Sequence, residues 1–151
     1  MAFTFAGLLR LGETPRRTAA AFALGVFFSF SPLLGLQIVL AMSLAFLLRL
    51  NRLAVFAGLN ANLPWIMVPW YAGTTAAAAA VIGTPLPADF RRELGGLLSL
   101  GVFSRDFWSQ AAGWLRPFLI PFLVGPTIGA ALIGAASYPV TYAVLIRRPR
   151  V

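Results

Sequence analysis

Three long runs without a charged side chain constrain this sequence more than any other feature. They extend over residues 18–48, 53–83 and 117–146, and each holds about 30 residues. A straight helix needs roughly 20 apolar residues to cross a hydrocarbon core of about 30 Å. Each run is therefore longer than one straight crossing, yet too short for two full crossings and a turn.

The composition outside these runs excludes most soluble classes of protein. Of the 151 residues, 60% are hydrophobic and 11% are charged, whereas soluble domains hold about 25% charged residues. Too few charges remain to cover a water-soluble globule, so we expect one membrane domain over residues 1–151. The absence of Cys and His removes thiolate nucleophiles and N/S metal sites, and every basic residue is Arg. We expect no enzyme, no metal site and no cofactor.

The first two runs are interrupted near their middle by a polar pair that leads into proline. The interrupting residues are Ser29, Ser31, Pro32, Gly35 and Gln37 in the first run and Asn60, Asn62, Pro64 and Pro69 in the second. Proline removes a helical hydrogen bond, and irregular backbone survives at membrane depth only where protein or water satisfies its polar groups. The pattern predicts an all-α membrane fold with two Pro/Gly-broken helical hairpins, residues 18–48 and 53–83. Whether they cross the membrane or re-enter on the same side stays open.

The positions of the arginines favour the arrangement in which both runs turn back. In that arrangement the N-terminus, Arg49 and Arg52 share one face with the arginines of residues 84–116. The excess of positive charge on that face would place it in the cytoplasm. Single crossings would instead divide the twelve arginines almost equally between the two faces.

The last third of the sequence has a different pattern. Residues 118–146, within the run 117–146, read as one long, kinked transmembrane helix, with a bent hairpin as the alternative. Small residues recur along it at helical spacing, namely Gly125, Gly129, Ala130 and Gly134, and such faces let helices approach closely in lipid. Residues 84–116 form an amphipathic pattern that begins after Asp89, which is typical of a segment at the membrane surface.

Two groups of side chains are candidates for binding a lipid or a small solute. Ser29, Ser31, Gln37, Asn60 and Asn62 bring hydroxyl and amide groups to membrane depth, where broken helices also present free N–H groups. The alternative is that they only satisfy the backbone that Pro32 and Pro64 release. The second group is Arg16, Arg17, Arg49 and Arg52, whose guanidinium groups suit phosphate oxygens but could equally set the topology.

The same residues carry a resemblance to a known family. The motifs are Pro15-Arg16-Arg17, Gly25-Val26-Phe27, Pro32-Leu33-Leu34-Gly35-Leu36-Gln37, Leu48-Arg49-Leu50-Asn51-Arg52 and Pro64-Trp65. In this combination the chain resembles the DUF2062 family of small bacterial membrane proteins, whose function is unknown. The resemblance implies an inner-membrane location, and related domains fused to glycosyltransferase-like enzymes imply work at the cell envelope. The family often has Asn-Pro-Trp-Thr where this chain has Leu63-Pro64-Trp65-Ile66, so two polar groups of the second break are missing here.

The sequence supports two hypotheses about function. The first is an inner-membrane protein, with its arginine-rich face cytoplasmic, that binds, transports or flips an anionic lipid or small solute at the broken-helix core. The second is an adaptor that positions envelope or lipid-linked glycosylation enzymes without transport. We expect membrane lipids and further copies of this chain as partners. Nucleic acid is not expected, because the aromatic residues lie mostly within the apolar runs, apart from the basic ones.

Overall fold

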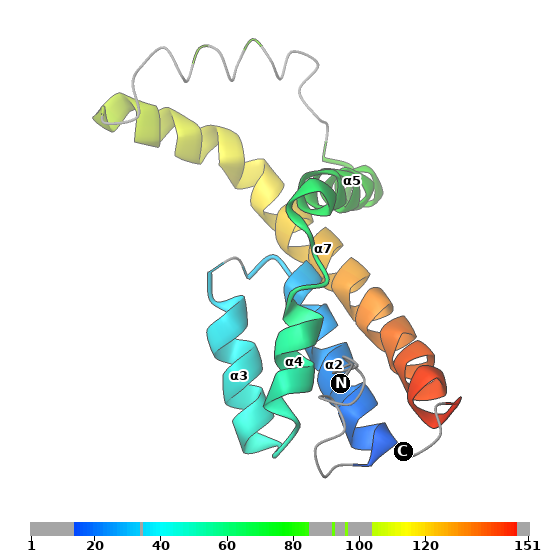
Figure 1. The fold of residues 1–151 in the computed structure, drawn as a ribbon. Coiled ribbons are helices and arrows are strands. Elements are labelled where there is room, and N and C mark those ends of the chain that lie inside the picture. The colour runs from blue at the N-terminus through cyan, green and yellow to red at the C-terminus, as the bar shows by residue number, and fades with distance from the viewer. Residues whose placement is uncertain (1–13, 34, 85–91, 93–95, 97–103, 148–151) are drawn as a thin grey trace. The chain divides into compact units, whose positions relative to one another are not determined.

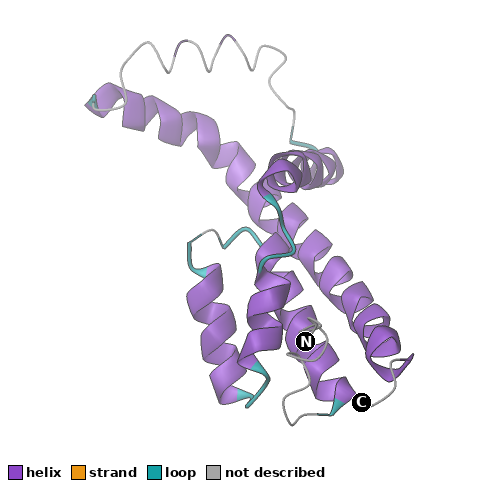
Figure 2. Cartoon of the chain, viewed as in Figure 1, coloured by secondary structure: helices purple, strands orange, loops and turns teal. Residues whose placement is uncertain are grey.

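The described part of the chain is entirely helical, which confirms the predicted all-α class. The computed structural model describes residues 14–33, 35–84, 92, 96 and 104–147, and these contain five helices and no strand (Figures 1 and 2). The helices are α2 (Pro15–Phe30), α3 (Gln37–Leu47), α4 (Arg52–Leu59), α5 (Pro64–Ile82) and α7 (Arg105–Arg147).

The chain divides into two compact units, which we describe separately. Unit 1 contains Met1–Pro69 and Thr127–Val151, and unit 2 contains Trp70–Pro126. Both divisions fall at a proline within a helix, since Pro69 lies inside α5 and Pro126 inside α7. Proline removes one hydrogen bond from the helical ladder.

Local sequence explains where α2 and α3 begin and end. Pro15 occupies the first helical position after Thr14, where proline loses no helical hydrogen bond. The helix ends at Phe30, two residues before Pro32. Gly35 has a φ of 88°, which side chains disfavour, and the chain turns there before α3 begins at Gln37.

A tight turn joins α3 to α4. Arg49 adopts a left-handed φ of 51°, and the N–H of Leu50 donates to the carbonyl of Ala45 at 2.8 Å. The Asn51 side chain then caps α4 by accepting a hydrogen bond from the N–H of Ala54 at 3.1 Å. Within the Leu48–Arg52 motif, Arg49 and Asn51 therefore shape the turn and stabilise the start of α4.

Helices α2 and α4 cross at two glycines. A Cβ placed on Gly25 would overlap the carbonyl of Val55 and lie 2.9 Å from the Cα of Gly58. A Cβ on Gly58 would overlap the carbonyl of Phe22 and lie 2.9 Å from the Cα of Gly25. The two backbones meet with no side chain between them, as small residues permit in membrane helices.

Small side chains also form much of the buried core of unit 1. The core cluster consists of Ala21, Phe28, Ala41, Ala45, Ala54, Val55 and Leu59, from α2, α3 and α4. On α3 the buried residues Ala41 and Ala45 are one turn apart and place one face of the helix against this cluster. The C-terminal part of α7 contacts α2 within the same unit, where Gly134 meets Phe27.

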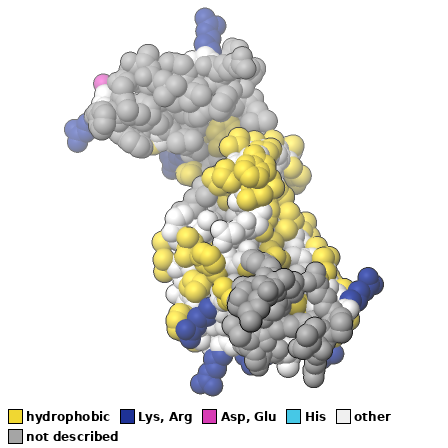
Figure 3. All heavy atoms as spheres, viewed as in Figure 1, with side chains coloured by type: hydrophobic (Ala, Val, Ile, Leu, Met, Phe, Trp, Pro, Cys, Tyr) yellow, Lys and Arg dark blue, Asp and Glu magenta, His cyan; other side chains and the backbone are white. Residues whose placement is uncertain are grey.

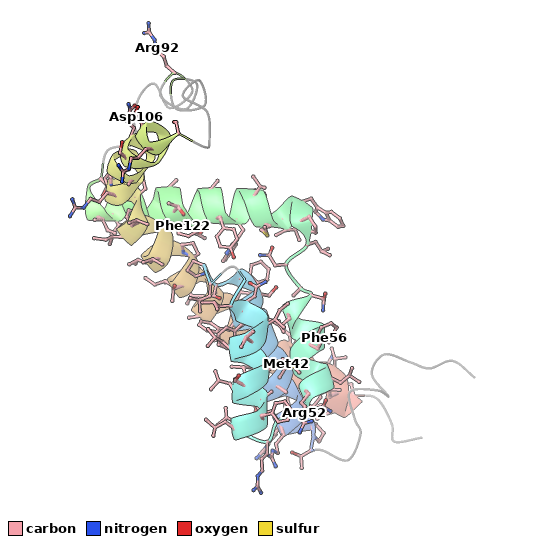
Figure 4. All side chains as sticks on the ribbon, turned by 90° about the vertical axis from the view of Figure 1, so that its left-hand side faces the viewer. Met42, Arg52, Phe56, Arg92, Asp106 and Phe122 are labelled. Atoms are coloured by element: carbon pink, nitrogen blue, oxygen red, sulfur yellow. The ribbon has the colours of Figure 1, made fainter. Side chains whose placement is uncertain are left out.

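Unit 2 holds a second close approach between helices. A Cβ on Gly125 of α7 would overlap the carbonyl of Thr74 on α5 and lie 3.0 Å from the Cβ of Ala78. The rings of Tyr71 and Phe122 lie beside this contact, with centroids 5.8 Å apart (Figure 4). The small residues of the third run therefore pack against other helices of this chain.

Helix α7 begins earlier than the sequence pattern predicts. It starts at Arg105 rather than Phe118 and continues through Pro117 without a break. Asp106 lies in its first turn, where a carboxylate interacts favourably with the helix dipole. The C-terminal end of the predicted surface segment is thus helical, while residues 85–91, 93–95 and 97–103 of that segment, including the proposed cap Asp89, lie outside the described residues.

Two helices are long and apolar enough to span a membrane. They are Pro64–Ile82 and the Arg116–Arg147 part of α7. Only 6% and 22% of their most apolar windows are buried within the molecule. The core helix of a soluble protein would be mostly buried, so this exposure fits an apolar surrounding better than water.

Candidate functional site

Ser29 and Asn62 join the end of α2 to the segment between α4 and α5. The Ser29 hydroxyl is buried, donates to the carbonyl of Leu59 at 2.8 Å and accepts from the N–H of Asn62 at 2.9 Å. The Nδ2 of Asn62 donates back to the carbonyl of Ser29 at 3.0 Å. These bonds satisfy backbone groups that the two helix ends release.

Ser31 and Asn60, two further polar residues of the breaks, make local hydrogen bonds. The Ser31 hydroxyl donates to the carbonyl of Phe28 at 2.9 Å, and the Nδ2 of Asn60 donates to the carbonyl of Phe56 at 2.7 Å. Ser31 is buried, whereas Asn60 is exposed. Pro32 and Gly35 lie between α2 and α3, Pro64 is the first residue of α5, and Pro69 lies within α5.

Two buried oxygen atoms in this region accept no hydrogen bond. They are the Oε1 of Gln37, the first residue of α3, and the Oδ1 of Asn62. Gln37 lies one turn before Ala41 and so belongs to the face of α3 that packs on the core. Buried polar atoms usually have a partner, so these two oxygens mark a place where a ligand or water can donate.

Four of the predicted arginines gather at the opposite end of the short helices. Arg16 and Arg17 lie in the first turn of α2, whereas Arg49 and Arg52 flank the turn between α3 and α4. The Arg17 guanidinium donates to the carbonyls of Leu48 and Arg49 at 3.2 and 2.9 Å. Two of the family-like motifs, Pro15–Arg17 and Leu48–Arg52, therefore contact each other directly.

The arginines at this end have no carboxylate near them in the described sequence of unit 1. We call the group formed by Arg16, Arg17, Arg49, Arg52 and Arg147 the arginine end (Figures 1 and 3). All five side chains are exposed, and residues 14–33, 35–69 and 127–147 contain no Asp or Glu. The Arg52 guanidinium also lies 3.7 Å from the centre of the Phe46 ring. Figure 4 labels Arg52 at the start of α4.

The candidate residues thus fall into two groups. We call the group around residues 31–33, 35–37 and 60–63, where α2 and α4 end and α3 begins, the break end (Figure 1). Helix α2 connects the two groups and is about 24 Å long at 1.5 Å per residue. Serine and amide side chains at the break end and guanidinium groups at the arginine end therefore cannot hold the same small headgroup.

Sequence reasoning missed the glycines that place the two breaks together. Gly25 precedes Ser29 by four residues, and Gly58 precedes Asn62 by four. In α2 this spacing is one helical turn, whereas α4 ends at Leu59 and Asn62 lies in the segment that follows. A search for the same small-to-polar spacing in the two runs could have paired α2 with α4.

Comparison with known proteins leads to one family. No curated protein and no solved structure matches this chain. A family described as "Uncharacterized protein conserved in bacteria (DUF2062)" matches residues 1–150, which is nearly the whole chain. The chain therefore belongs to the DUF2062 family, as its motifs predict.

Proposed function

We propose that this protein is an integral membrane protein of the bacterial inner membrane that binds anionic lipid headgroups at its arginine end. The observation that carries the proposal is a group of exposed arginines, with no carboxylate in the described residues of unit 1, at one end of a bundle with exposed apolar flanks. Anionic lipids attract such a group, and the positive-inside rule favours the cytoplasmic face.

The apolar flanks of the bundle support placement in lipid. Most outward side chains of α3 are large and apolar, with Val39 61% exposed and Leu47 77% exposed. On α4, Phe56 is 51% exposed (Figure 4). Exposed apolar surface of this extent marks contact with lipid or with another protein.

The lengths of the first helices support entry into the membrane without a complete crossing. Helices α2 and α3 are about 24 and 16 Å long, less than the hydrocarbon thickness of about 30 Å. Arg17 holds the start of α2 beside the end of α3. We infer a re-entrant hairpin that begins and ends at the cytoplasmic surface.

The same arrangement suits movement of an anionic lipid or a small anionic solute. Guanidinium groups bind phosphate oxygens with two parallel hydrogen bonds, so the arginine end would capture the headgroup. One chain offers few helices to enclose a path, so the proposal includes assembly of several copies.

Lipid selectivity tests the arginine end. Protein in nanodiscs would be offered phosphatidylglycerol and phosphatidylcholine, and retained lipid would be measured by native mass spectrometry. We expect a preference for phosphatidylglycerol that falls at least about fivefold, roughly 1 kcal/mol, when Arg16, Arg17, Arg49 and Arg52 become Gln. Arg105→Gln in unit 2 is the matched control and should leave the preference intact.

The result also distinguishes the two hypotheses about function. Flux of fluorescent phosphatidylglycerol between leaflets, lost in the Gln variant, would support transport. Equal retention of both lipids by the unaltered protein would contradict the proposal. Copurification of an envelope enzyme without lipid preference would instead favour the adaptor hypothesis.

A further inference from the structure

We propose that the break end is a second binding site, which takes a headgroup with hydrogen-bond donors, either a primary ammonium or hydroxyl groups. This inference rests on the proposed placement in a membrane and names the ligand chemistry of the broken-helix core. The arginine end takes an anion, whereas the break end presents acceptor atoms.

The amide of Asn62 has a defined orientation. Its Nδ2 donates to the carbonyl of Ser29, and its backbone N–H donates to the Ser29 hydroxyl. The opposite orientation would bring Oδ1 against that carbonyl, where two acceptors cannot bond. The Oδ1 atom is therefore an acceptor, and it is buried without a donor.

No described side chain donates to that oxygen. The Ser29 hydroxyl already donates to Leu59, and the Ser31 hydroxyl donates to Phe28. The amide of Asn60 donates to Phe56 within its own helical segment. Because Oδ1 is buried without a donor among the described residues, a ligand can donate a hydrogen bond to it.

Gln37 provides a second acceptor from the other break. Its Oε1 is buried without a partner at the start of α3, the helix that packs on α4. Helix α3 begins at the end of unit 1 where α4 ends (Figure 1). One buried oxygen without a partner thus comes from each break.

The depth of the break end favours a lipid as the source. With the arginine end at the cytoplasmic surface, α2 reaches about 24 Å into a core about 30 Å thick. The break end would then lie near the headgroups of the opposite leaflet. Neutral or zwitterionic headgroups with donors can reach such acceptors without the cost of burying a net charge.

Lipids whose headgroups differ in hydrogen-bond donors test the site. Protein in nanodiscs would be offered phosphatidylethanolamine, phosphatidylcholine, which has no N–H, and monogalactosyl diacylglycerol as the hydroxyl probe. Native mass spectrometry would measure retention. We expect phosphatidylethanolamine or the galactolipid to exceed phosphatidylcholine by about tenfold, as hydrogen bonding to a buried acceptor implies. Competition by free phosphoethanolamine or galactose would assign the same donor chemistry to a soluble solute.

Four substitutions, one of them a control, identify the acceptor. Asn62→Leu should abolish the preference, whereas Asn62→Asp, which keeps an acceptor oxygen but loses Nδ2, should retain it for phosphatidylethanolamine. Gln110→Leu removes an amide from an exposed position of α7, outside the break end, and should have no effect. Gln37→Leu should reduce the preference if the second acceptor takes part. Far-UV circular dichroism and gel filtration in detergent would verify that each variant is folded.

The outcomes separate this site from the arginine end. Equal retention of all three neutral lipids by the unaltered protein would overturn the proposal and assign both oxygens to water. Loss of the preference in Asn62→Asp and Asn62→Leu alike would also overturn it, because Nδ2 rather than the acceptor would then matter. Neither result affects the preference for phosphatidylglycerol, which tests the arginine end independently.

Discussion

At the scale of single residues, the glycines of this chain differ in what surrounds them. Gly25 and Gly58 are in contact with the backbone of the opposite helix, whereas nothing lies within 4 Å of a Cβ added to Gly73 of α5. The sequence presents all three alike, as glycines within apolar runs. Packing therefore decides whether a methyl group can be accommodated.

This difference predicts opposite results for the same substitution. Gly25→Ala or Gly58→Ala should destabilise the protein by about 1–3 kcal/mol, because the helices must separate to admit the methyl group. Gly73→Ala is the matched control and should be neutral or stabilising by up to about 1 kcal/mol, since alanine favours helix. SDS titration in mixed micelles, followed by circular dichroism, measures both. Similar midpoints for Gly25→Ala and Gly73→Ala would contradict the crossing.

At the scale of helices, the Ser29 hydroxyl joins the end of α2 to the end of α4 through hydrogen bonds. It serves one donor and one acceptor of the backbone, at Asn62 and Leu59. Both groups become free when the hydroxyl is lost. The cost of leaving buried groups unpaired exceeds the net value of the hydrogen bonds themselves.

We therefore expect Ser29→Ala to lower the free energy of unfolding by about 1–3 kcal/mol. Ser43→Ala, on the exposed side of α3, should change it by less than about 0.5 kcal/mol. Thermal unfolding in detergent would measure the difference. Equal melting temperatures for the two variants would show that the Ser29 bonds do not stabilise the bundle.

Much of the helical organisation could be predicted from the sequence, because its signals are local. Pro15 fixes the start of α2, and the Pro32–Gly35 segment separates α2 from α3. The start of α7 could not be predicted in this way, because its first three turns are amphipathic and Pro117 looks like a boundary. A proline removes only one bond of the helical ladder, and the remaining turns keep this helix continuous.

The residues of the candidate site could be predicted from the sequence, but their hydrogen-bond partners could not. The polar break pattern identifies Ser29 and Asn62, since such groups are rare in apolar runs. Their mutual hydrogen bonds depend on the crossing of α2 and α4, which separate runs of sequence do not encode visibly. The pairing of Arg17 with carbonyls of the α3–α4 turn is likewise a contact across 31 and 32 positions.

At the scale of the whole molecule, the absence of cysteine makes the topology directly measurable. Single substitutions Arg16→Cys, Arg49→Cys and Arg147→Cys should react with a membrane-impermeant maleimide from the cytoplasmic side only. Their positions at one end of unit 1 require a common side in any membrane placement of that unit (Figure 1). Labelling of residues 16 and 49 from opposite sides would exclude the re-entrant hairpin.

The crossing of α2 with α4 has a further consequence for how copies of this chain can associate. Its contacts pair Gly25 with Gly58, Phe22 with Gly58 and Gly25 with Val55, and Ser29 meets Asn62 at a separation of 33 positions. Phe22 and Val55, like the two glycines, are also 33 positions apart, so the two helices run parallel and meet at corresponding positions. Helices α2 and α4 of one chain therefore pack in the way that two parallel helices from separate chains would. The glycine faces that would join two separate chains are already occupied, and self-association must use other surfaces.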